Sequence, residues 1–281
     1  MDKEKGKSHV PDETPEEIEN YWTPERVKNA VPKPHDKPKG PAGDQAPKEA
    51  PQAGPSKVVS PGTPQYLACG KLVFTWNGTD YAGSASAIDA NVLVTAAHNI
   101  YDFNDEGKGS YSTNIMFYAA YTGPPPTYTF AYNAALAPDG WVNQPKGSRP
   151  HKYDYAVVRT AKTMEALAPL RLQINVQPTN LSQWDAIGYP GSPADGKTMY
   201  EVLGTYIVGT EPGTIGMTNN DMAQGSSGGP WLVVSNGLQF LVNGLNSYGD
   251  TQMYSPYFDN GVANLVLQIK QEPTVRRPSS A

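Results

Sequence analysis

One short stretch of the chain, Gly225-Ser226-Ser227-Gly228-Gly229-Pro230, sets a serine between glycines. A serine hydroxyl is a weak nucleophile by itself, and the tetrahedral intermediate of acyl transfer carries an oxyanion that backbone N–H groups must stabilise. Glycine has no side chain, so the backbone can come close to a reacting carbonyl. The stretch therefore predicts Ser227 as an acyl-transfer nucleophile, with the N–H groups of Gly225 and Ser227 as the oxyanion-binding pair.

The order of the other candidate residues decides between two kinds of site. The stretch also fits the Gly-x-Ser-x-Gly turn of α/β-hydrolases, in which the histidine follows the serine. All four histidines precede Ser227 in this chain: His9, His35, His98 and His151. The order His98, Asp154, Ser227 instead matches a second known arrangement of the triad, in which the histidine comes first and the serine last. We predict His98 as the general base, after the apolar run Val92 to Thr95, and Asp154 as the acid that orients it.

Competing acids and metal ligands are weaker candidates. Asp102 and Asp105 follow His98 closely in a polar, glycine-containing loop, which we interpret as a solvated acidic loop. Its start resembles a calcium loop, but the twelfth position is Thr113 and not glutamate. One cysteine and four scattered histidines predict no transition-metal site. We expect His151 to be a surface histidine.

These motifs together carry a family resemblance. Thr95-Ala96-Ala97-His98, Asp154-Tyr155-Ala156-Val157-Val158, Ile187-Gly188-Tyr189-Pro190-Gly191 and the serine stretch followed by Trp231 cover most of residues 66 to 270. The chain resembles the chymotrypsin-fold, trypsin-like serine endopeptidases, and is most similar to the disulfide-poor branch that includes the glutamyl endopeptidases. The resemblance implies an all-β fold of two six-stranded Greek-key β-barrels with the catalytic cleft between them and a C-terminal helix. It also implies hydrolysis of protein or peptide substrates through a Ser227 acyl-enzyme, with no cofactor.

The resemblance suggests a substrate pocket as well. Asp221 matches the position where a carboxylate at the pocket base binds Arg or Lys, whereas Ala223 replaces a disulfide-forming cysteine. Ser247, Tyr248 and Gly249 match the opposite wall of that pocket. Gly261 would leave the pocket open. Asp221 could instead be a solvated turn residue, so both interpretations stay open.

Three further departures bear on function. Asn246 stands where glutamyl endopeptidases use a histidine to meet the substrate carboxylate, which disfavours that specificity. Ser226 replaces the aspartate that pairs with a freed amine in trypsin-like zymogens, so either the enzyme is competent without processing or the N-terminal segment inhibits by another route. A non-catalytic member of the fold that acts as a binding module is the alternative function.

Composition bounds the domain organisation. Nine prolines lie between Val31 and Pro64, so we expect residues 1–60 to be a Pro-rich, largely disordered segment or pro-segment with a short helix near Trp22. Residues 61–281 would form the protease domain. With 22 Lys plus Arg against 27 Asp plus Glu and no basic patch, nucleic acid is not an expected partner. No apolar run is long enough to span a membrane.

Compartment and redox state follow less directly. The residues after Met1 lack the apolar core of a secretory signal, although the resemblance suggests a secreted protein. Cys69 has no partner for an intramolecular disulfide, and we expect it to be a buried apolar residue. The sequence sets no oligomeric state.

Short β-rich runs broken by turn residues indicate an all-β fold. We expect a C-terminal helix over 263–270 and a helix after Thr23, with Thr23 as its N-cap and Pro24 at its first position. The expected strands are 72–76, 81–88, 92–95, 115–121, 128–133, 155–160, 186–189, 200–208, 231–234 and 238–245.

Overall fold

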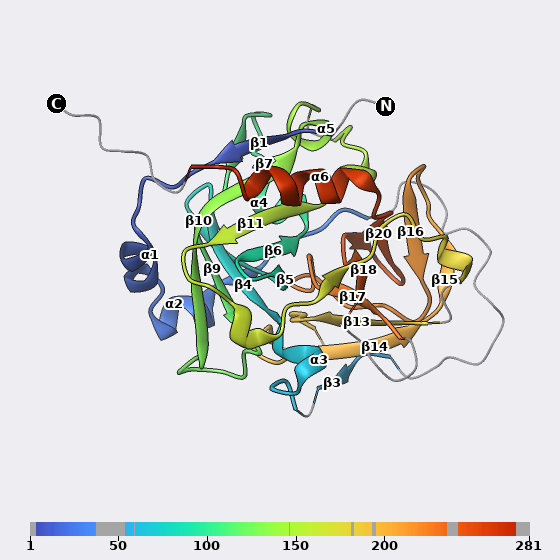
Figure 1. Cartoon of the computed structure of the whole chain (residues 1–281), viewed down its shortest axis with the longest axis horizontal. Coiled ribbons are helices and arrows are strands. Elements are labelled where there is room, and N and C mark those ends of the chain that lie inside the picture. Colours follow the sequence, from blue (N-terminus) through green and yellow to red (C-terminus); the bar gives the residue numbers. More distant parts are fainter. Residues whose placement is uncertain are drawn as a thin grey trace.

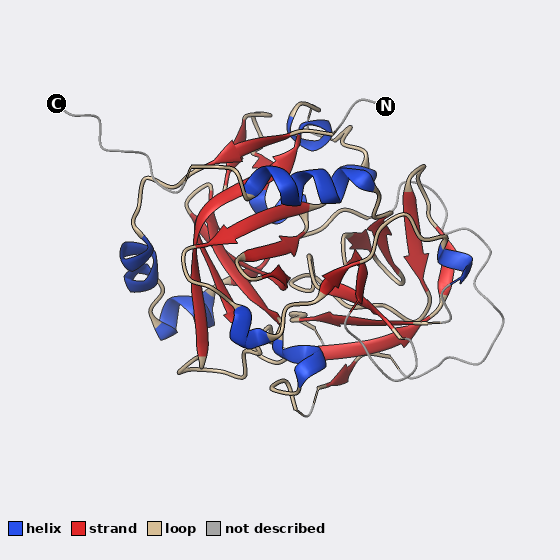
Figure 2. Cartoon of the chain, viewed as in Figure 1, coloured by secondary structure: helices blue, strands red, loops and turns tan. Residues whose placement is uncertain are grey.

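The computed structural model describes residues 4–37, 54–58, 60–145, 147–180, 183–192, 195–234 and 241–273. Strands make up most of the fold, and short helices lie around their edges (Figure 2). The predicted all-β class with a C-terminal helix is confirmed.

The first half of the domain is a closed six-stranded barrel, because its longest strand pairs on both sides. The first part of that strand pairs with the strand before it, from Tyr128 to Ala131, and its second part pairs with the strand after it. A bulge between Tyr132 and Ala134 separates the two ladders. The barrel strands are β4 (Cys69–Trp76), β5 (Thr79–Asp89), β6 (Val92–Thr95), β9 (Thr113–Ala119), β10 (Tyr128–Pro138) and β11 (Ala156–Thr160).

The second half is built from two sheets, which lie opposite the closed barrel in Figure 1. Trp184 and Trp231 fill the space between strands, with ring centroids 5.4 Å apart. The six-stranded sheet contains β12 (Arg171–Leu172), β18 (Leu241–Leu245), β17 (Pro230–Val233), β13 (Trp184–Gly188), β14 (Tyr200–Gly204) and β3 (Ser56–Lys57). The four-stranded sheet contains β15 (Tyr206–Val208), β16 (Thr214–Met217), β20 (Met253–Pro256) and β19 (Tyr248–Gly249).

The expected strands differ from the observed ones in a few places. The single strand predicted over 200–208 is broken at Thr205, and its two parts belong to different sheets. Strands β16 and β20 were not predicted, because Gly216 and Pro256 interrupt the usual strand pattern. Residues 238–240 of the last predicted strand lie outside the described residues. A small hairpin, β7 (Tyr101–Phe103) and β8 (Gly109–Tyr111), follows the first barrel's third strand.

The C-terminal helix α6 (Asn260–Ile269) lies across the first barrel beside β11 (Figure 1). Asp259 caps it by accepting the N–H of Gly261 at 2.7 Å. Leu265 and Ile269, one turn apart, are fully buried against the barrel. The shorter helices are α3 (Pro64–Leu67), α4 (Ala97–Ile100), α5 (Asp139–Val142), η1 (His151–Tyr153), η2 (Glu165–Leu167) and η3 (Pro178–Asn180).

The described part of the N-terminal segment packs on the first barrel. Strand β1 (Gly6–His9) pairs with β10, and helices α1 (Pro15–Tyr21) and α2 (Pro24–Asn29) lie on the outside of the barrel (Figure 1). Thr23 caps α2 as expected, and Pro24 begins it.

Burial accounts for this packing. Ile18, Trp22 and Val27 are buried, and the Trp22 indole donates to the Asn114 carbonyl at 2.6 Å. Residues 4–37 are thus ordered on the domain, unlike the largely disordered segment that composition suggested. The domain boundary at residue 60 stays a prediction.

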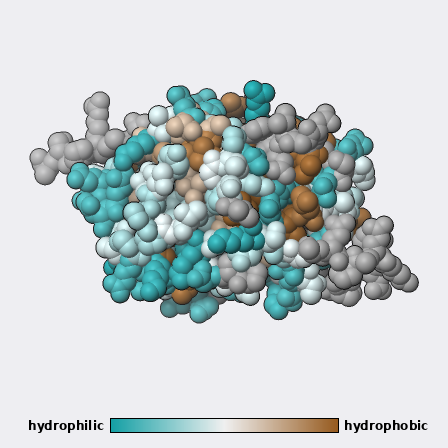
Figure 3. Space-filling view, turned by 90° about the horizontal axis from the view of Figure 1, so that it is seen from below, coloured by the Kyte–Doolittle hydropathy of each residue, from teal (hydrophilic) through white to brown (hydrophobic). Residues whose placement is uncertain are grey.

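One face of the molecule is mostly polar. On the face shown in Figure 3, hydrophilic residues predominate and hydrophobic atoms lie in a few separate patches. Among the residues described, no helix is long and apolar enough to cross a membrane. Cys69 is fully buried, and burial raises the pKa of its thiol, so it packs as an apolar residue.

Candidate active site

His98 and Asp154 form a buried pair. His98 lies in α4, one turn past the end of β6, and Asp154 follows η1 and precedes β11. The His98 Nδ1 atom lies 2.8 Å from Asp154 Oδ2, and the His98 backbone N–H donates to Oδ1 at 2.9 Å. The strand pairing of β6 with β11 brings the two residues together, because Thr95 lies opposite Ala156. The sequence prediction that these two residues meet agrees with this geometry.

A third donor completes the surroundings of Asp154. Ser247 Oγ donates to Asp154 Oδ2 at 2.5 Å, from the second half of the molecule. Burial alone would raise the pKa of Asp154, but the neighbouring His98 and the hydrogen bonds from His98 and Ser247 outweigh it and lower that pKa. Asp154 is therefore an ionised carboxylate that fixes the imidazole with Nδ1–H as donor. Ser247 was expected in the substrate pocket, whereas its hydroxyl acts here on the acid.

Ser227 lies on the turn that leads into β17 and is tied to the first barrel through its carbonyl. That carbonyl accepts the Ser84 N–H at 2.8 Å and the Asn99 side-chain amide at 2.9 Å. Ser227 is 0% exposed and His98 is 7% exposed. Ser227 Oγ and His98 Nε2, the two atoms between which a proton would move, are both buried and have no hydrogen-bond partner within the described residues.

Two backbone N–H groups near Ser227 are candidates for binding an oxyanion. The Gln224 carbonyl accepts the Gly191 N–H at 2.8 Å, and the Ser226 carbonyl accepts the Gly229 N–H at 2.9 Å. In a trans peptide the N–H points opposite to the carbonyl, so the Gly225 and Ser227 N–H groups point away from these partners. Gly225 has a φ of +94°, a conformation that favours glycine. This arrangement suits an oxyanion-binding pair.

A cleft of about 350 Å³ contains two of the five expected pocket residues, Asp221 and Gly249. Asp221, Gln224 and Gly249 line it, together with a second carboxylate, Asp250. Asp221 lines the cleft and is exposed. The rest of the wall consists of Pro32, His35, Lys37, Gly191, Ser192 and Ala223.

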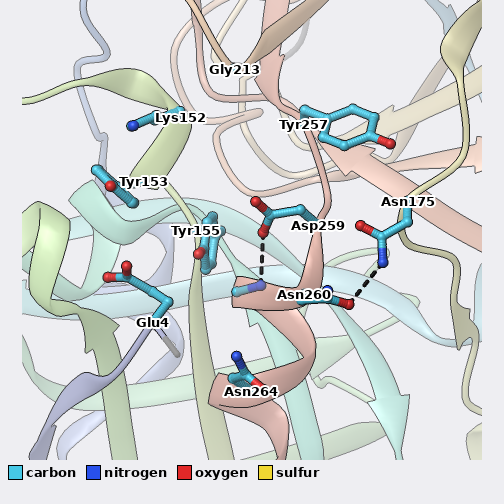
Figure 4. A pocket seen from close by; sticks show the side chains of 11 residues that line it. Glu4, Lys152, Tyr153, Tyr155, Asn175, Gly213, Tyr257, Asp259, Asn260 and Asn264 are labelled. Carbon is cyan, nitrogen blue, oxygen red and sulfur yellow. Dashed lines mark hydrogen bonds between the residues drawn. The ribbon is translucent and has the colours of Figure 1, made fainter. Parts of the chain in front are cut away.

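Besides Ser247, two expected pocket residues do not line this cleft. Gly261 lies in the first turn of α6, where an added Cβ would meet the Tyr155 hydroxyl, so it is not part of the Asp221 cleft. It borders a separate pocket with Glu4 and Asp259, shown in Figure 4. Tyr248 does not line the Asp221 cleft, and its ring stacks on the His151 imidazole at 3.9 Å. Both differences arise from the long-range folding of the second half.

His151 is not the surface histidine that the sequence suggested. It is 1% exposed, and its Nδ1 lies 2.9 Å from Glu211 Oε1 while its Nε2 lies 3.3 Å from Asp36 Oδ2. Burial lowers its pKa, but Asp36, Asp154 and Glu211 outweigh burial and raise it. A sequence signal was absent because Asp36 and Glu211 lie far from His151 along the chain.

Asp102 is likewise more than a solvated loop acid. Its carboxylate pairs with Lys33 Nζ and with Arg149, each at 2.9 Å. The Asn246 side chain is buried and hydrogen-bonds Asn220 and the Trp231 indole, so it has a structural role. No group of three or more possible metal ligands occurs among the residues described.

Comparison with solved structures places the fold. No protein-family model and no curated protein sequence matches this chain. A thermostable serine protease from an extremophilic microorganism is similar with a TM-score of 0.65 and 24% identity, over 74% of this chain and 100% of that protein. The protease Anisep from Arthrobacter nicotinovorans is similar with a TM-score of 0.60 and 26% identity, over 71% of this chain and 93% of that protein. A Glu endopeptidase is similar with a TM-score of 0.62 and 19% identity, over 79% of this chain and 98% of that protein.

These similarities agree with the resemblance seen in the sequence. The chain has the fold of the chymotrypsin-like serine proteases, including the glutamyl endopeptidase type. At the level of the fold they support a serine protease.

Proposed function

We propose that this protein is a serine endopeptidase with His98, Asp154 and Ser227 as its catalytic triad. The observation that carries the proposal is the buried His98–Asp154 pair at 2.8 Å, in a fold whose solved relatives are serine proteases. The Ser227 carbonyl accepts a hydrogen bond from the side chain of Asn99, the residue after His98, which supports the placement of the serine beside the histidine.

The chemistry follows from the roles of these groups. Ser227 Oγ attacks the carbonyl carbon of a peptide bond while His98 Nε2 takes its proton, and the N–H groups of Gly225 and Ser227 stabilise the oxyanion. The C–N bond then breaks, and His98 returns the proton to the departing amine. A water molecule then attacks the acyl-enzyme while His98 takes its proton, and the bond to Ser227 Oγ breaks as His98 returns that proton to the serine. Asp154 stays ionised and stabilises the imidazolium form of His98.

A preference for Arg or Lys in the substrate is the specificity that the cleft favours. Asp221 and Asp250 give the cleft two carboxylates, and Lys37 of the chain itself pairs with Asp250 at 3.0 Å. An ammonium or guanidinium group suits such a wall better than a carboxylate does. Glutamyl specificity is disfavoured, because the Asn246 side chain is committed to buried hydrogen bonds.

Cleavage kinetics on a peptide library test the proposal. Ser227→Ala should lower turnover by ~10,000-fold or more, as expected for a triad residue. Ser226→Ala is the matched control, since Ser226 Oγ has no hydrogen-bond partner within the described residues and its loss should leave most of the activity. Equal losses in both variants would refute the assignment of the nucleophile. A protein that neither cleaves peptides nor reacts with a fluorophosphonate probe would favour the non-catalytic binding module.

A further inference from the structure

Residues 31–37, here called the strap, cross the face of the candidate active site. Val31–Pro32 form β2, which pairs in parallel with Tyr81–Ala82 of β5 in the first barrel. The Lys33 N–H then donates to the Ala82 carbonyl at 2.8 Å. Four residues after β2, the Asp36 carbonyl accepts the Gly249 N–H at 3.1 Å, in the second half. The strap therefore bridges the two halves on either side of the triad.

The middle of the strap lies against the catalytic groups. A Cβ built on Gly225 would lie 3.3 Å from Pro32 Cβ, and one built on Gly191 would lie 2.5 Å from Pro32 Cγ. Pro32 thus packs on the glycine whose N–H is the candidate oxyanion donor. His35 lines the same cleft as Gly191 and Gly249, and burial and the His98 charge lower its pKa to about 4, so His35 is neutral at physiological pH.

Side-chain contacts fix both ends of the strap. Lys33 is 3% exposed; its Nζ pairs with Asp102 at 2.9 Å and lies 3.9 Å from the centre of the Trp76 ring. At the other end the Asp36 carboxylate meets His151 Nε2, whose Nδ1 is held by Glu211. The Lys33 ammonium and the His151 imidazole are buried and each has a carboxylate partner, although the Asp36 side chain itself is 62% exposed.

The consequence is that a protein substrate has no access. Ser227 is 0% exposed, and the strap occupies the Gly249 N–H and the Ala82 carbonyl, backbone groups with which an extended peptide could otherwise pair. Prolines at 32 and 34 remove two N–H groups and fix φ, so the strap cannot form a continuous ladder with the cleft. We infer that the strap is an intramolecular inhibitor, which occupies the cleft and has to leave before a substrate binds.

The test uses the full-length chain and a variant that releases the strap, Lys33→Ala combined with Asp36→Ala. In this variant Asp102 still pairs with Arg149, and His151 still pairs with Glu211, so neither group is left without a charged partner. The matched control is Lys162→Ala with Glu19→Ala, which removes an ion pair between α1 and the first barrel away from the cleft. Both pairs of changes remove one positive and one negative charge.

Peptide cleavage should rise at least tenfold in kcat/KM in the strap variant and stay within twofold in the control. The gain should appear mainly as a lower KM, because a cleft that is open only part of the time weakens apparent binding in proportion. Unchanged kinetics in an active strap variant would overturn the inference.

Amide hydrogen exchange separates this inference from the proposed function on which the kinetic readout rests. The segment containing Gly249 should be protected in the wild type and in the control, and should exchange faster in the strap variant. That difference is expected whether or not the protein is an active peptidase. Equal exchange in the wild type and the strap variant would show that the strap does not hold the cleft, whatever the activity.

Discussion

Replacing Ser247 with alanine removes one of three donors to the Asp154 carboxylate, the others being the His98 N–H and Nδ1. A hydrogen bond to a charged group contributes ~1.5–3 kcal/mol, and a factor of ten in rate corresponds to about 1.4 kcal/mol. Two donors remain in the variant, so the lower part of this range applies. We expect kcat/KM to fall about tenfold, with Ser86→Ala as a control because the buried Ser86 Oγ has no partner among the described residues.

The pH profile distinguishes this role from a general loss of stability. The folded-state pKa of Asp154 is lowered, so its ionised form stabilises the site at higher pH and is lost as pH falls through that pKa. Removing the Ser247 donor weakens this lowering, so the loss of kcat/KM that accompanies protonation of Asp154 at low pH should begin at a higher pH. An equal loss at every pH, or the same loss in Ser86→Ala, would refute the reasoning.

Three further outcomes follow from the surroundings of Asp221, His151 and Cys69. Asp221→Ser should flatten a preference for Arg or Lys, which a charge-assisted bond makes ~10- to 150-fold, in a peptide-library profile; a wild-type profile dominated by Glu would contradict this. The pKa of His151 is raised, so its ion pair with Asp36 is fully formed at low pH and is lost as the pH rises through that pKa. Amide hydrogen exchange of the strap, corrected for the intrinsic rate, should therefore increase with pH in the wild type. The His151→Gln variant should show no such increase. Cys69 should resist iodoacetamide until the protein unfolds, because burial raises its thiol pKa, and rapid alkylation of native protein would contradict this.

The sequence was informative where function depends on local motifs. Each candidate triad residue sits in a short motif at the end or start of a strand, so order along the chain was enough to group His98, Asp154 and Ser227. The apolar spacing that ends at Ile269 likewise predicted the C-terminal helix, within three residues at its start.

The remainder of the site depends on contacts that leave no local pattern. The strap contains two prolines and only a two-residue strand, so it has the composition of a linker although its ends are anchored. His151 acquires its partners from positions 36 and 211, and Ser247 reaches Asp154 across the two halves. Such pairs form only once the sheets are assembled, and no periodicity in the sequence reports them.

Mass spectrometry after treatment with a fluorophosphonate probe tests the central claim most directly, because the probe reacts only with an activated serine. The wild type and the strap variant should each gain one adduct, on the peptide that contains Ser227, with faster labelling in the strap variant. Ser227→Ala should gain none, and His98→Ala should label far more slowly because it lacks the base. No adduct in the strap variant, or an adduct on a serine other than Ser227, would contradict the account.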